Sequence, residues 1–116
     1  MVSSICQRLL NKQWKLYELE NVPSIQGIYL IGVTVPLQDP KVLYVGRSND
    51  VHRRMGEHKR KDLAIDEYVK EQFAFNDGED LRIKWVREIN SDHRESEFRE
   101  CIAKKLGYWP KYNIQD

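Results

Sequence analysis

The architecture follows from the stretch GIYLIGVTV, residues 27–35, and from the shorter stretch VLYVG, residues 42–46. Both are rich in β-branched and aromatic residues, and both are short and bounded by turn residues, which predicts two strands. The intervening residues 36–40, PLQDP, predict a turn. A connection of this length cannot hold a crossover helix, so the strands are expected to pair antiparallel as a hairpin.

The apolar periodicity outside this hairpin predicts helices over residues 3–20, 51–59 and 65–75, a strand over 81–87, and a last helix ended by Gly107. The expected capping residues are Ser48, Asn49 or Asp50 for the second helix, and Ser91 or Asp92 for the last.

This order of elements predicts an α+β fold with a small three-stranded, mainly antiparallel sheet flanked by helices. We expect one domain over residues 1–116, with an N-terminal helix within 1–22 and the core over 25–116.

The composition supports a packed core. The chain has 116 residues, of which 41% are hydrophobic and 32% charged, a size typical of one domain. Six Gly and four Pro are too few for a collagen-like or disordered chain. No stretch reaches the roughly 20 apolar residues of a membrane span, and the N-terminus lacks the apolar run of a secretory signal. Cys6 and Cys101 form no CxxC pair, so we expect buried free thiols and an intracellular protein, cytoplasmic or nuclear.

The near-neutral net charge of +1 hides two stretches of opposite charge. Residues 41–61 hold seven basic and two acidic side chains, whereas residues 62–80 hold seven acidic side chains and one lysine. A polyanion such as DNA would find one basic surface on this protein. The charges alone fit two solvated faces of opposite sign equally well.

The predicted elements bring together the residue types that phosphodiester hydrolysis uses. Tyr29 and Tyr44 occupy matching places in the two arms of the hairpin, so their phenols are expected to emerge side by side. Arg54 and His58 share one face of the next helix, and Glu97 lies early in the last helix. Such a reaction needs a base for water, a cation for the developing charge and a metal to polarise the phosphate. One carboxylate suits Mg²⁺, or Mn²⁺ in its place.

The segments Gly27-Ile28-Tyr29 and Tyr44-Val45-Gly46, separated by fourteen residues, resemble the two-part signature of the GIY-YIG nucleases. Arg54 comes ten positions after Tyr44, and His58 four positions later. This spacing matches the helix pattern of that family, with His58 closest to its intron-homing branch.

Two later segments extend the resemblance. The acidic stretch at 95–97 matches the family's acidic helix, and Pro110-Lys111-Tyr112-Asn113 matches its closing asparagine motif. The resemblance covers residues 27–113, and five elements in the correct order are hard to obtain by chance. It implies the fold of that family and a metal-dependent endonuclease activity on DNA with a single metal ion.

The resemblance implies a role for each matching residue. Tyr29 would activate or position the attacking water, as a general base if a nearby cation lowers its pKa from about 10. Tyr44 would orient the water or the phosphate, and Arg54 would stabilise charge on the phosphate oxygens. His58 would hydrogen bond to the departing group or protonate it, and Asn113 would brace the site through hydrogen bonds.

The metal ligand implied by the resemblance is Glu97, and the spacing leaves Glu95 and Glu100 open as alternatives. Gly27 and Gly46 complete the signature as structural residues of the site. Gly46 is expected to permit close approach of backbone or substrate at the turn from strand to helix.

Ordinary structural roles compete with these assignments. Arg54 would pair with Glu57 or Asp50 on a solvated helix, His58 would be a surface histidine, and Glu97 would contact His93 at i,i+4 spacing.

Basic residues around the second helix are expected to bind DNA phosphates without reading the sequence: Lys41, Arg47, Arg53, Lys59 and Arg60. The first hypothesis is therefore a DNA endonuclease of repair or recombination, whose specificity comes from a partner protein or a second subunit. The alternative is a catalytically inactive module of the same fold that binds nucleic acid or protein.

Overall fold

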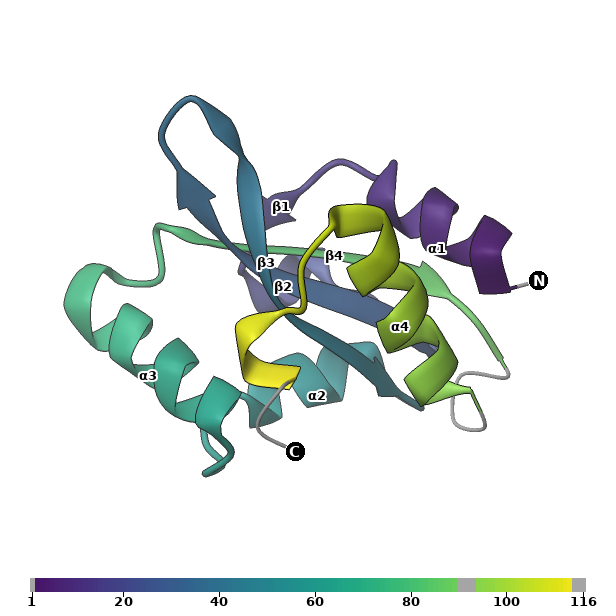
Figure 1. Ribbon diagram of the computed structural model, residues 1–116. Helices are drawn as coiled ribbons and strands as arrows, with labels where there is room; N and C mark the ends of the chain where they lie inside the picture. Colours follow the sequence, from purple (N-terminus) through teal and green to yellow (C-terminus); the bar gives the residue numbers. More distant parts are fainter. Residues whose placement is uncertain (1, 90–93, 114–116) are drawn as a thin grey trace.

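The computed structural model describes residues 2–89 and 94–113 of the chain. Its main elements are α1 (Val2–Leu10), β1 (Lys15–Leu16), β2 (Gly27–Val35), β3 (Gln38–Ser48), α2 (Val51–Glu57), α3 (Ala64–Asn76), β4 (Leu81–Arg87) and α4 (Glu95–Leu106). The chain also forms the 3₁₀ turns η1 (Leu19–Asn21) and η3 (Lys111–Asn113). Figure 1 shows a twisted sheet with helices on both faces, and the tip of the β2–β3 hairpin projects beyond the body.

The predicted hairpin lies within the sheet. β2 begins and ends at the predicted residues, and it pairs antiparallel with β3, with Tyr29 opposite Gly46. The turn is tighter than predicted: Leu37 adopts a left-handed φ of 64°, and only residues 36–37 separate the two strands. β3 therefore already begins at Gln38.

The sheet has four strands in the order β1-β4-β2-β3, all antiparallel. The α+β class is confirmed, but the predicted count of three strands is wrong. The additional strand, β1, pairs Lys15 with Ile83 and Leu16 with Arg82 at the outer side of β4. A strand of two residues has no alternation of its own, so a sequence pattern cannot reveal it.

The first helix is shorter than the predicted 3–20 and ends at Leu10. The Lys84 ammonium group on β4 donates hydrogen bonds to the carbonyls of Leu10 at 2.8 Å and Lys12 at 3.2 Å. A lysine bound to the last carbonyls of a helix favours its termination there. The Lys84 ammonium also lies 4.5 Å from the centroid of the Trp14 ring. The apolar spacing continues past residue 10, but the backbone does not stay helical.

The sheet separates two apolar clusters, because successive side chains of a strand point to opposite faces. The α2–α3 face buries Tyr17, Val22, Tyr29, Ile31, Tyr44, Val51, Met55, Ile65, Val69, Leu81 and Ile83. The α1–α4 face buries Cys6, Leu9, Ile28, Leu30, Val42, Val45, Val86, Phe98 and Ile102. Both cysteines carry free thiols; Cys6 is buried and Cys101 is half-buried.

Local signals define most helix ends. Asp50 caps α2 by accepting a hydrogen bond from the N–H of Arg53 at 3.0 Å, which selects one of the three predicted caps. α3 ends at Asp77 and Gly78, both with positive φ, and α4 ends at Gly107 with a φ of 84°. The predicted caps Ser91 and Asp92 of α4 lie outside the described residues. No helix in the described part of the chain has the length and apolar content needed to cross a membrane.

Candidate functional site

Three ring side chains from separate elements meet on the α2–α3 face of the sheet. Tyr29 comes from β2, Tyr44 from β3, and His58 from the position directly after α2. The ring centroids are 6.2 Å apart for Tyr29 and Tyr44, 5.7 Å for Tyr29 and His58, and 5.6 Å for Tyr44 and His58. Three of the residues predicted to act together are therefore mutual neighbours.

The hairpin register and the signature glycines explain this packing. Tyr29 lies opposite Gly46, two residues after Tyr44 on the neighbouring strand, so both phenols stand on one face. A Cβ at Gly46 would overlap the ring and hydroxyl of Tyr29. A Cβ at Gly27 would overlap the carbonyl oxygen of Val86 in β4. The close approach at Gly46 is thus made by the Tyr29 side chain.

A hydrogen-bonded chain of buried groups links Tyr29 to α3. The Tyr29 hydroxyl lies 2.7 Å from His58 Nε2, and His58 Nδ1 lies 2.5 Å from Asp66 Oδ1. Asp66 Oδ2 accepts a hydrogen bond from the backbone N–H of Leu63 at 3.0 Å. The exposed fraction is 1% for Tyr29 and 0% for His58 and Asp66. His58 is therefore a buried residue and not the surface histidine of the competing interpretation.

Burial and hydrogen bonding set the protonation states of Tyr29, His58 and Asp66. Burial raises the pKa of Tyr29 well above its ordinary value of 10, and the Arg54 charge opposes that rise. Burial also lowers the pKa of His58 below 6.5, against the opposite effect of Asp66. Burial raises the pKa of Asp66, but hydrogen bonds from His58 and Leu63 outweigh it and hold that pKa below 3.8. At neutral pH the phenol is protonated, the imidazole is neutral and the carboxylate is charged.

Arg54 stands at the border between this cluster and solvent. Its side chain is 16% exposed, and Nη1 lies 3.6 Å from Glu57 Oε1. Its positive charge lowers the pKa of Tyr29, His58 and Asp66. Arg54 therefore makes the ion pair of the competing interpretation, and it also places a cation next to the buried phenol and imidazole.

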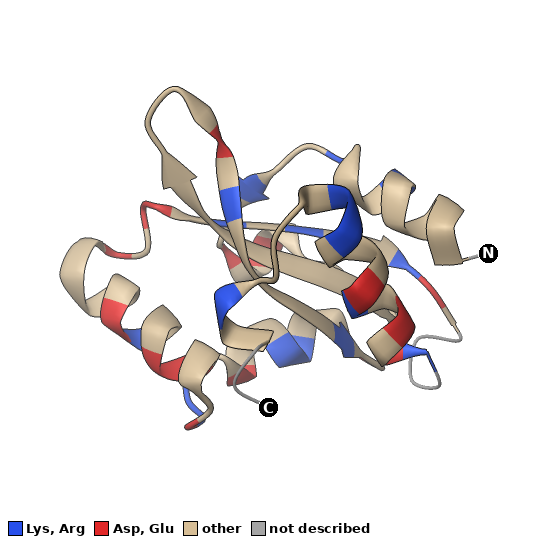
Figure 2. Cartoon of the chain, in the orientation of Figure 1, with Lys and Arg blue, Asp and Glu red and all other residues tan. Residues whose placement is uncertain are grey.

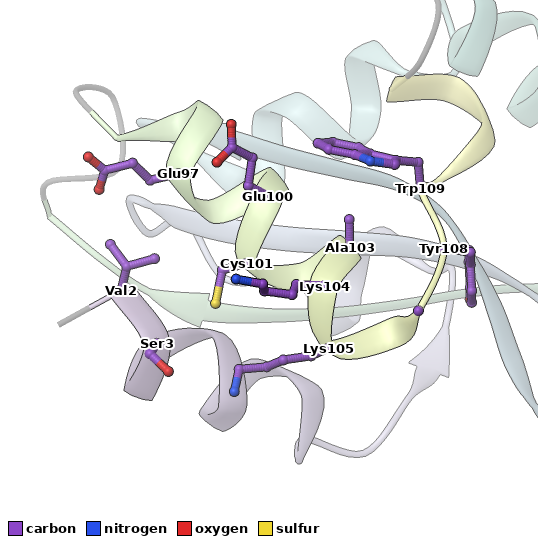
Figure 3. Close-up of a pocket in the computed structure, with 11 residues that line it drawn as sticks. Val2, Ser3, Glu97, Glu100, Cys101, Ala103, Lys104, Lys105, Tyr108 and Trp109 are labelled. Carbon is purple, nitrogen blue, oxygen red and sulfur yellow. The ribbon is translucent and has the colours of Figure 1, made fainter.

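The candidate carboxylates of α4 face different surroundings. Glu97 is 56% exposed, and its Oε2 lies 3.0 Å from Arg94 Nε. Together with Glu100 and Cys101 it lines a groove between α1 and α4 (Figure 3). That groove lies on the α1–α4 face of the sheet, opposite the face that bears Tyr29. The structure thus does not bring Glu97 or Glu100 to the tyrosines.

Glu95 is the carboxylate of α4 whose charge reaches the cluster, because it contributes to the raised pKa of Tyr29. Its side chain is 37% exposed, and Oε2 lies 3.3 Å from Arg99 Nη2. His93, the competing partner of Glu97, lies outside the described residues. Within the described ranges, no three His, Cys, Asp or Glu side chains gather as a metal site. A hard cation takes oxygen ligands and retains much of its water, so one carboxylate such as Glu95 is the least that a metal site here would need.

Asn113 is bound to the strand that carries Tyr44. Its Oδ1 accepts a hydrogen bond from the N–H of Val45 at 2.8 Å, and its Nδ2 donates to the carbonyl of Val45 at 3.1 Å. Asn113 is 8% exposed. Val45 lies between Tyr44 and Gly46, so Asn113 fixes the backbone from which Tyr44 projects.

Four of the five residues predicted to bind DNA phosphates lie at the end of β3, on α2 and just after it: Arg47, Arg53, Lys59 and Arg60. The fifth, Lys41, lies earlier on β3, with its ammonium 5.9 Å from the ring centroid of Tyr108. Figure 2 shows basic residues on α2 and acidic ones along α3. Arg53 is exposed, but Nε lies 3.7 Å from Glu57 Oε2. The Lys59 ammonium lies 4.3 Å from the ring centroid of Phe73. The basic surface is therefore accessible and partly neutralised by Glu57.

Asp66 is the residue of this site that the sequence pattern did not reveal. It lies eight residues after His58, in the first turn of the next helix, where an acidic residue is ordinary. The available signal is local: an acid at the third helical position accepts a hydrogen bond from the backbone N–H of the residue before the helix, here Leu63. That signal predicts a helix start and says nothing of His58.

No family model, curated protein or solved structure matches this chain. The resemblance to the GIY-YIG nucleases therefore rests on the motif residues of the sequence alone.

Proposed function

We propose that this chain is a GIY-YIG-like endonuclease domain that hydrolyses DNA phosphodiester bonds with a divalent metal. The observation that carries the proposal is the convergence of Tyr29, Tyr44, His58 and Arg54 around one point of the α2–α3 face. These residues come from two strands and a helix, in the order and spacing of that family's signature. Two phenols, an imidazole and a guanidinium supply proton transfer and charge stabilisation.

The exposed fractions of the side chains suggest different roles within the site. Arg54, with 16% of its side chain exposed, and Tyr44, with 8% of the residue exposed, are more accessible than Tyr29 and His58, so they would be the first groups to meet a phosphate. The guanidinium would hold the non-bridging oxygens and stabilise their charge in the transition state. Tyr29 and His58 lie beneath and would serve as proton acceptors. Substrate binding must then open the surface above the Tyr29 hydroxyl.

Glu95 is the carboxylate that we assign to the metal, in preference to Glu97. Bound there with its waters, Mg²⁺ or Mn²⁺ would polarise the phosphate and lower the pKa of a coordinated water. Arg99, 3.3 Å from Glu95 Oε2, is a competing cation for that carboxylate. The affinity for the metal is therefore expected to depend on release of this ion pair.

Arg47, Arg53, Lys59 and Arg60 would contact phosphates on either side of the cut. Such contacts position DNA without reading its sequence. The net charge of only +1 adds little long-range attraction. Recognition of a repair or recombination substrate would accordingly come from a partner protein or a second subunit.

A second function is favoured by the burial of Tyr29. Its hydroxyl is already hydrogen-bonded to His58, and only 1% of the residue is exposed. If the surface stays closed, the same fold would act as a nucleic-acid-binding or protein-interaction module without turnover.

The test is nicking of supercoiled plasmid in Mg²⁺ by four proteins: the unaltered chain, Arg54→Ala, Glu95→Gln and Glu97→Gln. We expect nicking by the unaltered chain and by Glu97→Gln, and a loss of about 100-fold or more in the other two. Glu97→Gln is a matched control, because Glu97 lies on the same turn of α4 as Glu95 and points to the other side of that helix.

The outcomes separate the two functions. Equal nicking by all four proteins would indicate a contaminating nuclease and overturn the enzymatic proposal. DNA binding without nicking by any of them would favour the inactive module. Loss of nicking in Glu97→Gln, with activity kept in Glu95→Gln, would return the metal to Glu97.

A further inference from the structure

Asp66 is a buried charge that does more than cap the start of α3. Its exposed fraction is 0%, and a buried carboxylate is costly unless its oxygens are hydrogen-bonded. Both of its oxygens are bonded: Oδ1 to His58 and Oδ2 to the N–H of Leu63. An apolar residue at this position would avoid that cost but leave the N–H groups of Leu63 and His58 without an acceptor. Capping of α3 explains the bond to Leu63, and it does not explain the bond to His58.

The hydrogen bonds determine which nitrogen of His58 carries the proton. A carboxylate only accepts hydrogen bonds, so Nδ1, 2.5 Å from Asp66 Oδ1, must donate. A neutral imidazole with its hydrogen on Nδ1 has a free lone pair on Nε2. The Tyr29 hydroxyl, 2.7 Å from Nε2, must then be the donor. In both hydrogen bonds the donor lies on the Tyr29 side: the phenol donates to the imidazole, and the imidazole donates to the carboxylate.

We propose that Asp66 is a positioning residue that holds His58 in the Nδ1–H form, so that Nε2 is the acceptor for the phenolic proton of Tyr29. The inference rests on the proposed nuclease function, and it names the residue that fixes which nitrogen of His58 accepts from Tyr29. Tyr29 and Asp66 are the hydrogen-bond partners of the two imidazole nitrogens.

The proton transfer takes place between Tyr29 and His58, with Asp66 as the stabilising charge. The Tyr29 O–H bond breaks, a bond from Nε2 to that hydrogen forms, and a phenolate faces an imidazolium. Asp66 stabilises the imidazolium from α3 and Arg54 stabilises the phenolate from α2. The phenolate then takes a proton from the attacking water. Tyr29 passes that proton to the departing oxygen, and the imidazolium returns its own proton to Tyr29.

The first measurement is the tautomer of His58 in the unaltered chain. Long-range ¹H–¹⁵N correlation spectra of the imidazole distinguish a protonated from a bare nitrogen. At pH 7.5 we expect a protonated Nδ1 and a bare Nε2. A protonated Nε2 with a bare Nδ1 would overturn the inference, and this result does not depend on any variant folding.

The second measurement uses Asp66→Asn. The N–H of Leu63 requires an acceptor, so the new amide oxygen would turn towards Leu63 and its NH₂ group towards His58 Nδ1. Nδ1 would then have to accept, and the hydrogen would move to Nε2. We expect the opposite tautomer and a nicking rate lower by about 100-fold or more. An unchanged tautomer in a folded Asp66→Asn protein would refute the positioning role.

Asp62→Asn is the matched control, because Asp62 precedes α3 by two residues and its side chain is 94% exposed. It should keep both the tautomer and the nicking rate. The pH profile of nicking is a further measurement, which would not change if Asp66 only supported the fold. The groups that face His58 are Tyr29, Tyr44, Arg54, Glu57 and Asp66. In Asp66→Asn the acid limb of the pH profile should shift, because the carboxylate no longer raises the pKa of His58.

Failure of the inference and failure of the proposed function are distinguishable. An unaltered chain with the expected tautomer that does not nick DNA would fail as a nuclease and leave the positioning of His58 intact. A chain that nicks DNA with the opposite tautomer would be a nuclease without this positioning.

Discussion

Gly46 determines whether Tyr29 can reach His58. Its missing side chain leaves the space that the Tyr29 ring and hydroxyl fill. Gly46→Ala should push the phenol away and lower the free energy of unfolding by about 1–3 kcal/mol, since overpacking a filled core is destabilising. Urea unfolding measures the loss, and the His58 imidazole resonances report whether the Tyr29 contact is broken.

Gly56→Ala is the control for this substitution. Gly56 lies within α2, and a Cβ there would meet the flexible end of Arg60 at 3.4 Å. Because Gly destabilises a helix interior, we expect a gain of about 0.5–1 kcal/mol. Equal losses for both substitutions would show that the packing against Tyr29 has no special weight.

At the residue scale, the sequence predicted Tyr29, Tyr44, Arg54 and His58 as neighbours because strand register and helix spacing fix relative positions over short stretches. It favoured Glu97 among the carboxylates of α4, whereas Glu95 is the one whose charge acts on Tyr29. Residues 95 and 97 of a helix point in directions about 200° apart, and the choice depends on which side of α4 faces the sheet. That orientation is set by the packing of Phe98 and Ile102, which is a property of the tertiary structure.

At the scale of elements, β2, β4 and α3 lie close to their predicted ranges because each has its own periodicity and its own turn residues. The segment after α1 does not. Trp14 and Tyr17 continue the spacing of a helix, but Trp14 packs under Lys84 while Tyr17 lies on the α2–α3 face. Contacts remote in sequence override the periodicity there.

The attachment of η3 to β3 depends on one side chain. Asn113→Ala removes two hydrogen bonds and leaves the N–H and carbonyl of Val45 without the amide that they share. We expect a loss of about 1–3 kcal/mol in the free energy of unfolding and faster hydrogen exchange at the Val45 amide.

Asn11→Ala is the control for that substitution, since Asn11 is exposed and accepts one hydrogen bond from Gln7. Its effect should stay within about 0.5 kcal/mol. Unchanged protection of the Val45 amide in Asn113→Ala would contradict the assignment of that contact.

At the scale of the whole molecule, the buried chain of Tyr29, His58 and Asp66 should limit the pH range of stability. The pKa values of His58 and Asp66 are lower in the folded state than their ordinary values of 6.5 and 3.8. The unfolded state therefore binds more protons in acid, and the free energy of unfolding should fall as the pH drops below 6.5 and again below 3.8. The pKa of Tyr29 is raised, so stability should also fall above pH 10.

Urea unfolding between pH 5 and pH 8 tests the first of these limits. One proton contributes a slope of at most about 1.4 kcal/mol per pH unit. His58→Gln should reduce that slope, whatever its effect on the stability at pH 8. His52→Gln, on the same helix and partly exposed, serves as the control. An equal slope in the unaltered chain and His58→Gln would exclude His58 as its source.

The docking of the C-terminal segment also affects how copies of the protein meet. β3 is the outermost strand on its side of the sheet, and the outward groups of such a strand are a template for a strand from another molecule. Asn113 occupies both groups of Val45, and the N–H of Val42 donates to the Tyr108 hydroxyl at 3.0 Å. At the opposite margin, β1 has only two residues. The β3 edge is covered by Tyr108 and Asn113, and the β1 edge is very short. While Tyr108 and Asn113 stay bound to β3, the sheet therefore offers little template for the addition of strands from other molecules.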